Sequence, residues 1–131
     1  AFSLRVLDGM VARLRHEGRF DDPVIRYRAG QARAACEAAR LLVYRVVDQR
    51  ARGLPPSADA NLARVSVIAA DHAVADFALD FLPDTFTGDA FPLHLSHHER
   101  AIASGIASGA AEIQLNLVAQ EYLRLPREAR A

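Results

Sequence analysis

Apolar residues recur every three or four positions along most of the chain, which is the spacing of one face of an α-helix. The first such segment runs from Ser3 to His16. Its apolar positions are Leu4, Leu7, Val11 and Leu14. Gly18 follows and supplies a helix stop. The pattern therefore predicts a first helix that ends just before Gly18.

The second apolar pattern is the longest in the chain. Asp22 is a good N-cap residue, Pro23 suits the first helical position, and only Gly30 interrupts the pattern before Gly53. These signals predict a helix of about thirty residues, some 45 Å long. Its stripe is rich in alanine, which permits the close approach of a neighbouring helix. The stripe consists of Ala32, Ala35, Cys36, Ala39, Leu42, Val43 and Val46.

A third helix is predicted after the turn Gly53-Leu54-Pro55-Pro56, with Ser57 or Asp59 as its N-cap and Phe81 near its end. Its apolar and aromatic positions leave little room for a polar face, so we expect this helix to be well buried. They are Leu62, Val65, Ile68, Ala69, His72, Ala75, Phe77 and Leu79.

The remainder is predicted to be irregular from Pro83 to Pro92, then helical from about His94 to Ser104, broken at Gly105–Gly109, and helical again from about Ala110 to Leu123. Leu125-Pro126 ends the last helix. We expect its inner side to consist of Ile113, Leu117 and Val118.

No segment has the alternation of a strand, and the length of 131 residues suits one domain. The prediction is a single all-α domain over residues 1–131, an antiparallel four-helix bundle of up-down topology with short loops.

Composition narrows the function and the compartment. The 16 basic and 16 acidic residues balance, which argues against nucleic acid as the main partner. No apolar run approaches the length of a membrane span. The single cysteine, Cys36, cannot form an internal disulfide, which favours a reducing cytoplasm. The chain starts at Ala1 rather than Met, so it is either processed or a piece of something longer.

Four polar residues, His94, His97, His98 and Glu99, form a candidate metal-binding group, because histidines three and four apart share a helix face. A solvated, polar helix start is the favoured interpretation, since a metal site needs three or four converging ligands. We therefore predict no metal site. His72, on the apolar third helix, is expected to be a buried, hydrogen-bonded histidine.

Other candidate groups have weaker signals. Cys36 is expected to be a buried, inert thiol, and the serines Ser66, Ser104 and Ser108 lack a neighbouring His–Asp pattern. The arginines Arg26, Arg33 and Arg40 form either an anion-binding edge or, more commonly, a solvated face with ion pairs. Gly105 and Gly109 lie next to a helix start, whose backbone N–H groups can hold an anion or the polar edge of a cofactor, and a plain turn between two helices explains the two glycines equally well.

The run Gly109–Ala119, which continues to Leu125-Pro126-Arg127-Glu128, resembles the C-terminal signature of the flavin-dependent acyl-CoA dehydrogenases. Ala38–Arg45 is similar to the long helix of the same domain, and the turn Gly53-Leu54-Pro55 falls in the expected order. Asp22–Arg26 resembles the variant of bacterial members that act on bulky acyl-CoA thioesters, such as steroid side-chain substrates.

The resemblance implies that the chain is the C-terminal helical bundle of an acyl-CoA dehydrogenase, and the C-terminal part of a longer polypeptide. It implies FAD as cofactor, an acyl-CoA as substrate, and assembly into homo- or hetero-oligomers through the bundle. The residues that it assigns to the flavin site are Ser108, Gly109, Ala110, Glu112, Thr87 and Gly88.

The chain departs from the family pattern at three places. Ser108 stands where one large branch carries its catalytic Glu, and Ala110 stands where a Thr is usual. The paired glycines of the family's flavin loop are missing from Leu82–Gly88. Because serine cannot abstract the α-proton of a thioester unaided, no catalytic residue is assigned. The alternative hypothesis is a non-catalytic assembly or partner subunit with the same bundle and no flavin.

Overall fold

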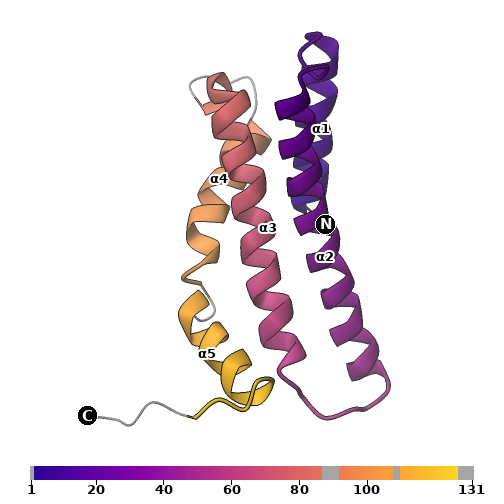
Figure 1. Cartoon of the computed structure of the whole chain (residues 1–131), viewed down its shortest axis with the longest axis vertical. Coiled ribbons are helices and arrows are strands. Elements are labelled where there is room, and N and C mark those ends of the chain that lie inside the picture. The colour runs from indigo at the N-terminus through magenta and orange to yellow at the C-terminus, as the bar shows by residue number, and fades with distance from the viewer. Residues whose placement is uncertain (1, 87–91, 108–109, 127–131) are drawn as a thin grey trace, which may run out of the picture.

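The computed structural model describes residues 2–86, 92–107 and 110–126, and of residues 92–95 it describes only the backbone. Within these ranges the chain forms helices and no strand (Figure 1). The elements are α1 (Phe2–His16), α2 (Pro23–Ala51), α3 (Asp59–Phe81), the short 3₁₀ helix η1 (Pro83–Phe86), α4 (Pro92–Ser104) and α5 (Ala111–Glu121). The all-α fold is thus confirmed. The prediction of a four-helix bundle is not confirmed, because α4 and α5 are separate helices and the described residues form five α-helices.

Two long antiparallel helices, α2 and α3, form the axis of the molecule (Figure 1). The shorter α1 packs against both of them and against α4. On the other side of α3, α4 and α5 follow one another along its length (Figure 1). Each of the outer helices therefore covers only part of the central pair.

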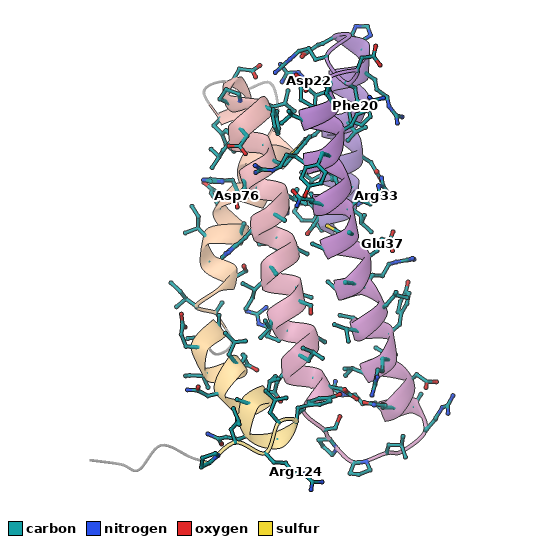
Figure 2. The ribbon with its side chains drawn as sticks, in the orientation of Figure 1. Phe20, Asp22, Arg33, Glu37, Asp76 and Arg124 are labelled. Atoms are coloured by element: carbon teal, nitrogen blue, oxygen red, sulfur yellow. The ribbon has the colours of Figure 1, made fainter. Side chains whose placement is uncertain are left out.

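The ends of α1 and α2 follow the sequence signals. Gly18 adopts a φ of 69°, the left-handed conformation that terminates a helix. The Asp22 carboxylate accepts a hydrogen bond from the backbone N–H of Val24 at 2.7 Å, and Pro23 begins α2. Figure 2 shows Phe20 and Asp22 at this turn.

The main hydrophobic core lies where α1 covers α2 and α3. We call this part, which consists of α1, residues 25–39 of α2 and residues 70–82 at and just after the end of α3, the covered half. Its fully buried side chains include Leu7, Leu14 and Phe77. The core cluster comprises Val6, Leu7, Met10, Leu14, Ile25, Ala29, Ala32, Cys36, Ala39, Ala70, Val74, Phe77, Ala78 and Leu82.

The rest of the central pair, residues 43–51 of α2 and 59–67 of α3, forms with α5 what we call the open half. It contributes nothing to the core cluster. Val43, predicted to belong to the buried stripe, is 39% exposed, and Ile113, predicted to face inward, is 55% exposed. Those two predictions are wrong because no helix covers these positions. Leu117 and Val118 are half-buried.

Two further expectations for α3 need correction. Its N-cap position is Ala58, which has no capping side chain. The predicted Ser57 lies one residue earlier, and its hydroxyl oxygen accepts a hydrogen bond from the N–H of Asp59 at 3.3 Å. The helix is also less enclosed than predicted, since Ala69, His72 and Leu79 are exposed between α2 and α4. Among the described residues, no helix combines the length and the apolarity that crossing a bilayer requires.

Candidate functional site

The break between α4 and α5 carries the residues that the sequence analysis assigned to a flavin site. α4 ends at Ser104, and the N–H of Ala111 donates to the carbonyl of Gly105 at 3.0 Å before α5 begins. Ala110, half-buried, is the N-cap of α5, and Glu112 lies exposed in its first turn. Of the other assigned residues, Ser108, Gly109, Thr87 and Gly88 lie outside the described part of the chain. The structure places Ala110 and Glu112 at the start of α5, and the assignment of all six residues to a flavin site stays a prediction.

Side chains from α3 hold this break in place. The guanidinium of Arg64 donates through Nη2 to the carbonyl oxygen of Ser104 at 2.6 Å and to that of Ala107. One turn earlier on α3, the Asn61 amide donates to Oε1 of Gln114 at 2.7 Å. Arg64 thus satisfies carbonyls at the end of α4, which have no partner within that helix. Sequence reasoning missed both residues, because a polar side chain on a mostly apolar helix does not reveal its partner.

The start of α5 can bind a negatively charged or electron-rich group. The first N–H groups of a helix lack partners within the helix, and the helix dipole places partial positive charge there. The methyl side chain of Ala110 cannot accept a hydrogen bond, and no side-chain cap is present. The N–H of Ala111 already donates to Gly105, so the backbone N–H groups of Glu112 and Ile113 are the binding groups that this end of the helix offers.

At the far end of α5, a carboxylate fastens the helix to α2 and α3. Asp59, 3% exposed, accepts hydrogen bonds from Nε of Arg45 at 3.1 Å, from the Gln49 amide and from the Tyr122 hydroxyl. The hydrogen bond from Tyr122, more than any other contact, holds the pKa of the Asp59 carboxyl below its usual range. We refer to these four residues as the Asp59 clamp.

A second buried carboxylate joins α1, α3 and α4. Asp71 accepts a hydrogen bond from the Ser3 hydroxyl at 2.5 Å and one from Nη2 of Arg100 at 3.3 Å. Nε2 of His97 lies 3.8 Å from the same carboxylate, and both of these side chains are almost completely buried. The Phe2 ring covers the group, with its centroid 5.6 Å from that of His97. We refer to Ser3, Asp71, His97 and Arg100 as the Asp71 network.

The Asp71 network contains Ser, His and Asp, but its geometry is not that of a hydrolase. In a catalytic triad the histidine lies between the serine and the carboxylate and accepts the serine proton. Here the Ser3 hydroxyl donates directly to Asp71. No histidine lies between Ser3 and the carboxylate, and the direct hydrogen bond fixes the first turn of α1 to α3.

The histidines occupy different environments from those predicted. His97, expected on a solvated helix start, is 1% exposed because it packs beneath Phe2. His72, expected to be buried, is exposed, although its Nε2 lies 2.9 Å from the carbonyl oxygen of Ala101 and makes the expected hydrogen bond. Helical spacing identified which residues share a face, but it could not show which face meets another helix and which meets solvent.

The candidate metal group does not converge in the described residues. His97 points into the Asp71 network, the His98 ring packs edge-on against Phe86 at 4.9 Å, and Glu99 is exposed. The side chain of His94 lies outside the description. No three His, Cys, Asp or Glu side chains come together as a metal site within the part of the chain that the structure describes.

The other candidate residues, namely Cys36, Arg33, Arg40 and Ser104, are buried or paired with other side chains or backbone groups. Cys36 is 3% exposed, as predicted, and burial raises the pKa of its thiol to about 11. Arg33 pairs with Asp8, and Arg40 pairs with Glu37 at 2.7 Å, which confirms the interpretation as a solvated face with ion pairs for these two arginines. Arg26 is exposed. The Ser104 hydroxyl donates to the carbonyl of Ala101 at 2.8 Å.

Comparison with known proteins agrees with the resemblance. Residues 2–123 match the family model described as acyl-CoA dehydrogenase, C-terminal domain. No curated protein and no solved structure matches the chain. The match spans nearly all of the chain, including the break between α4 and α5 and the whole of α5. The chain belongs to the acyl-CoA dehydrogenase family, and the part of the family that it matches is the C-terminal domain.

Proposed function

We propose that this chain supplies the C-terminal bundle of an FAD-dependent acyl-CoA dehydrogenase and is the C-terminal part of a longer polypeptide. The observation that carries the proposal is the family match over residues 2–123. The reaction is α,β-desaturation of an acyl-CoA thioester. The resemblance of Asp22–Arg26 to the variant in bacterial members favours a bulky or steroid-type acyl group.

The described residues fit the polar edge of a flavin at one place, the start of α5. Ala110 leaves the first N–H groups of this helix without a side-chain partner, and Arg64 holds the preceding carbonyls. The backbone near Ala110 and Glu112 would hold the cofactor by hydrogen bonding. When bound, FAD supplies the acceptor for the hydride from the β-carbon.

We assign no general base to this chain. Ser108 occupies the family's Glu position, and serine cannot remove the α-proton alone. The buried carboxylates Asp59 and Asp71 are occupied by three and two hydrogen bonds respectively, so neither is available. We therefore assign this chain a binding and positioning role, with the base on another part of the polypeptide or on a partner subunit.

A non-catalytic assembly subunit is the second candidate. Exposed apolar side chains near the end of α2 favour it, because large exposed apolar residues commonly mark protein interfaces. They are Leu41, Tyr44 and Val47, exposed by 57–61%. Both candidates predict an oligomer, and only the first predicts flavin.

The test uses the native protein, purified with its partners from the source cell. Flavin absorbance gives the FAD content, and reduction of an electron-accepting dye reports turnover of straight-chain and steroid-type acyl-CoA thioesters. We expect bound FAD and turnover with the bulky thioester. Protein that carries no flavin, alone or with its partner, would leave only the assembly candidate.

A substitution at the helix start sharpens this test. Ala110→Asp introduces a good N-cap, which maintains or raises the stability of α5, and it also places a negative charge where the cofactor edge would bind. We expect loss of FAD without loss of thermal stability. Ala34→Asp, the same change at an exposed position of α2, serves as the control. FAD retained in Ala110→Asp would exclude the start of α5 from the flavin site.

A further inference from the structure

Arg64 on α3 connects the two helices that meet at the break between α4 and α5. Both of these helices pack along α3 (Figure 1). The Arg64 side chain is half-buried, and its Nη2 donates to the carbonyl oxygen of Ser104 at 2.6 Å and to that of Ala107. One guanidinium nitrogen therefore attaches the last residue of α4 and the turn that follows it to the same point of α3.

The positive charge of Arg64 has no carboxylate partner among the described residues. Within these ranges its side chain forms no ion pair, and both of its hydrogen bonds go to backbone carbonyls. Arg28, which also bridges two helices, pairs instead with Asp80 at 2.6 Å. A carbonyl accepts the hydrogen bond but leaves the charge of the guanidinium in place. Arg64 therefore adds positive charge beside the start of α5, to which the helix dipole already contributes.

The carbonyls at the end of α4 oppose the binding that the start of α5 offers. The last carbonyls of a helix carry partial negative charge, whereas the first N–H groups carry partial positive charge. The two helix ends are adjacent, because the N–H of Ala111 donates to the carbonyl of Gly105 at 3.0 Å. An electron-rich group at the start of α5 would be repelled by free carbonyl oxygens so close to it. The hydrogen bonds from Arg64 occupy these oxygens and offset the repulsion.

We propose that Arg64 is a positioning residue of the cofactor site at the start of α5. Its hydrogen bonds to the carbonyls of Ser104 and Ala107 keep the N–H groups of Glu112 and Ile113 in place. Its charge strengthens the attraction of this site for the electron-rich edge of the flavin. The inference rests on the proposed flavin site, and it assigns Arg64 no contact with the flavin itself.

Asn61 allows the two parts of this role to be separated. It lies one turn before Arg64 on α3, and its amide donates to Oε1 of Gln114 at 2.7 Å. The Asn61 side chain is neutral, so it attaches α5 to α3 without adding charge. A defect that comes from a loosened α5 is therefore expected in Asn61→Ala and in Arg64→Gln. A defect that comes from the lost charge is expected in Arg64→Gln alone.

Titration with FAD tests the inference in the full native polypeptide. The bound flavin is removed, and the Kd for added FAD is measured by fluorescence at low and at high salt, which screens charge. We expect Arg64→Gln to raise the Kd about tenfold or more at low salt and to reduce its salt dependence. Arg64→Lys, which keeps the charge, should retain the salt dependence of the wild type, as should Asn61→Ala. Arg50→Gln, at an exposed position of α2, is the control and should bind FAD like the wild type.

Other results would overturn the inference. These are an unchanged Kd in Arg64→Gln, or a salt dependence that Asn61→Ala loses to the same extent. If Arg64→Gln does not fold, Arg64→Lys and Asn61→Ala decide: a salt dependence that is lost in Arg64→Lys, or a Kd that neither variant changes, rejects the proposal. Native protein that neither contains nor rebinds flavin refutes the proposed function, and the inference with it. Bound FAD with an unchanged Kd in Arg64→Gln refutes the inference alone.

Discussion

The covered half and the open half of the bundle are held together by different forces. In the covered half, α1, α2 and α3 enclose large apolar side chains such as Leu7, Met10 and Phe77, which are at most 1% exposed. In the open half, α5 has no buried residue, and its contacts with α3 include hydrogen bonds from Asn61 and to Asp59. One region relies on packing and the other on a few polar contacts.

This difference teaches that hydrogen bonds can fix the position of a helix such as α5 even where no hydrophobic core lies between it and its neighbour. Hydrophobic burial depends on apolar area and has no direction, whereas hydrogen bonds fix position and lose strength in water. Arg64 and Asp59 set where α5 begins and ends along α3, but they bury little apolar surface. The open half should therefore respond to charge and pH, and the covered half to changes in side-chain volume.

The largest expected effect comes from the covered half. Phe77→Ala removes a side chain that is 1% exposed and should lower the free energy of unfolding by about 4 kcal/mol, because it leaves a cavity in the core. Ile113→Ala, at a 55% exposed position of α5, should change it by less than about 0.5 kcal/mol. Urea unfolding of both variants measures the contrast, and equal losses would contradict it.

Asp71→Ala should cost nearly as much, about 3 kcal/mol, since it leaves Ser3 and His97 buried without the carboxylate that they face. Asp76→Ala, an exposed position on the same helix, is the matched control and should be almost neutral (Figure 2). Thermal unfolding compares the two. A neutral Asp71→Ala variant would show that the Asp71 network does not anchor α1.

In the open half, Tyr122→Phe should lower the stability at pH 7, by less than Asp71→Ala does, because it removes a hydrogen bond to a charged acceptor. The pKa of Asp59 is lowered in the folded state, so this contribution is complete above the ordinary Asp pKa of about 4 and disappears as the pH falls through the lowered value. The free energies of unfolding of the wild type and of Tyr122→Phe, measured between pH 7 and pH 2, should therefore become equal as the pH falls. Tyr27→Phe, on exposed α2, should show no such convergence.

The smallest effect is a gain. Arg124, just after α5, adopts a φ of 53°, a left-handed conformation that suits glycine better than arginine. Arg124→Gly should therefore stabilise the protein by about 0.5 kcal/mol (Figure 2). The midpoint of thermal unfolding measures this. A decrease would mean that the arginine side chain contributes more than its backbone costs.

Sequence reasoning located the helices well and their surroundings less well. Breakers and caps such as Gly18, Asp22 and Pro23 act locally, so the ends of α1 and α2 followed from the residues alone. Exposure depends on what lies opposite. Ile113 and Val43 have the spacing of core positions, yet no helix faces them.

The candidate site shows the same division. Ala110 and Glu112 could be assigned because they belong to a contiguous run of residues near the start of one helix. The residues that position this start, Arg64 and Asn61, lie about fifty positions away on α3. Neither their spacing nor their chemistry links them to the run in one sequence. His97 was missed for a related reason, since its partner Asp71 comes from another helix.

The two fastenings of α5 differ in how they respond to acid. A guanidinium keeps its charge at every physiological pH, so the hold of Arg64 on the carbonyls before α5 persists. The Asp59 carboxylate loses its charge in acid, and with it the hydrogen bonds that the charge strengthens. Acidification should therefore weaken the attachment of the far end of α5 more than that of its start. The charge state of one carboxylate, at Asp59, thus distinguishes the two ends of the same helix.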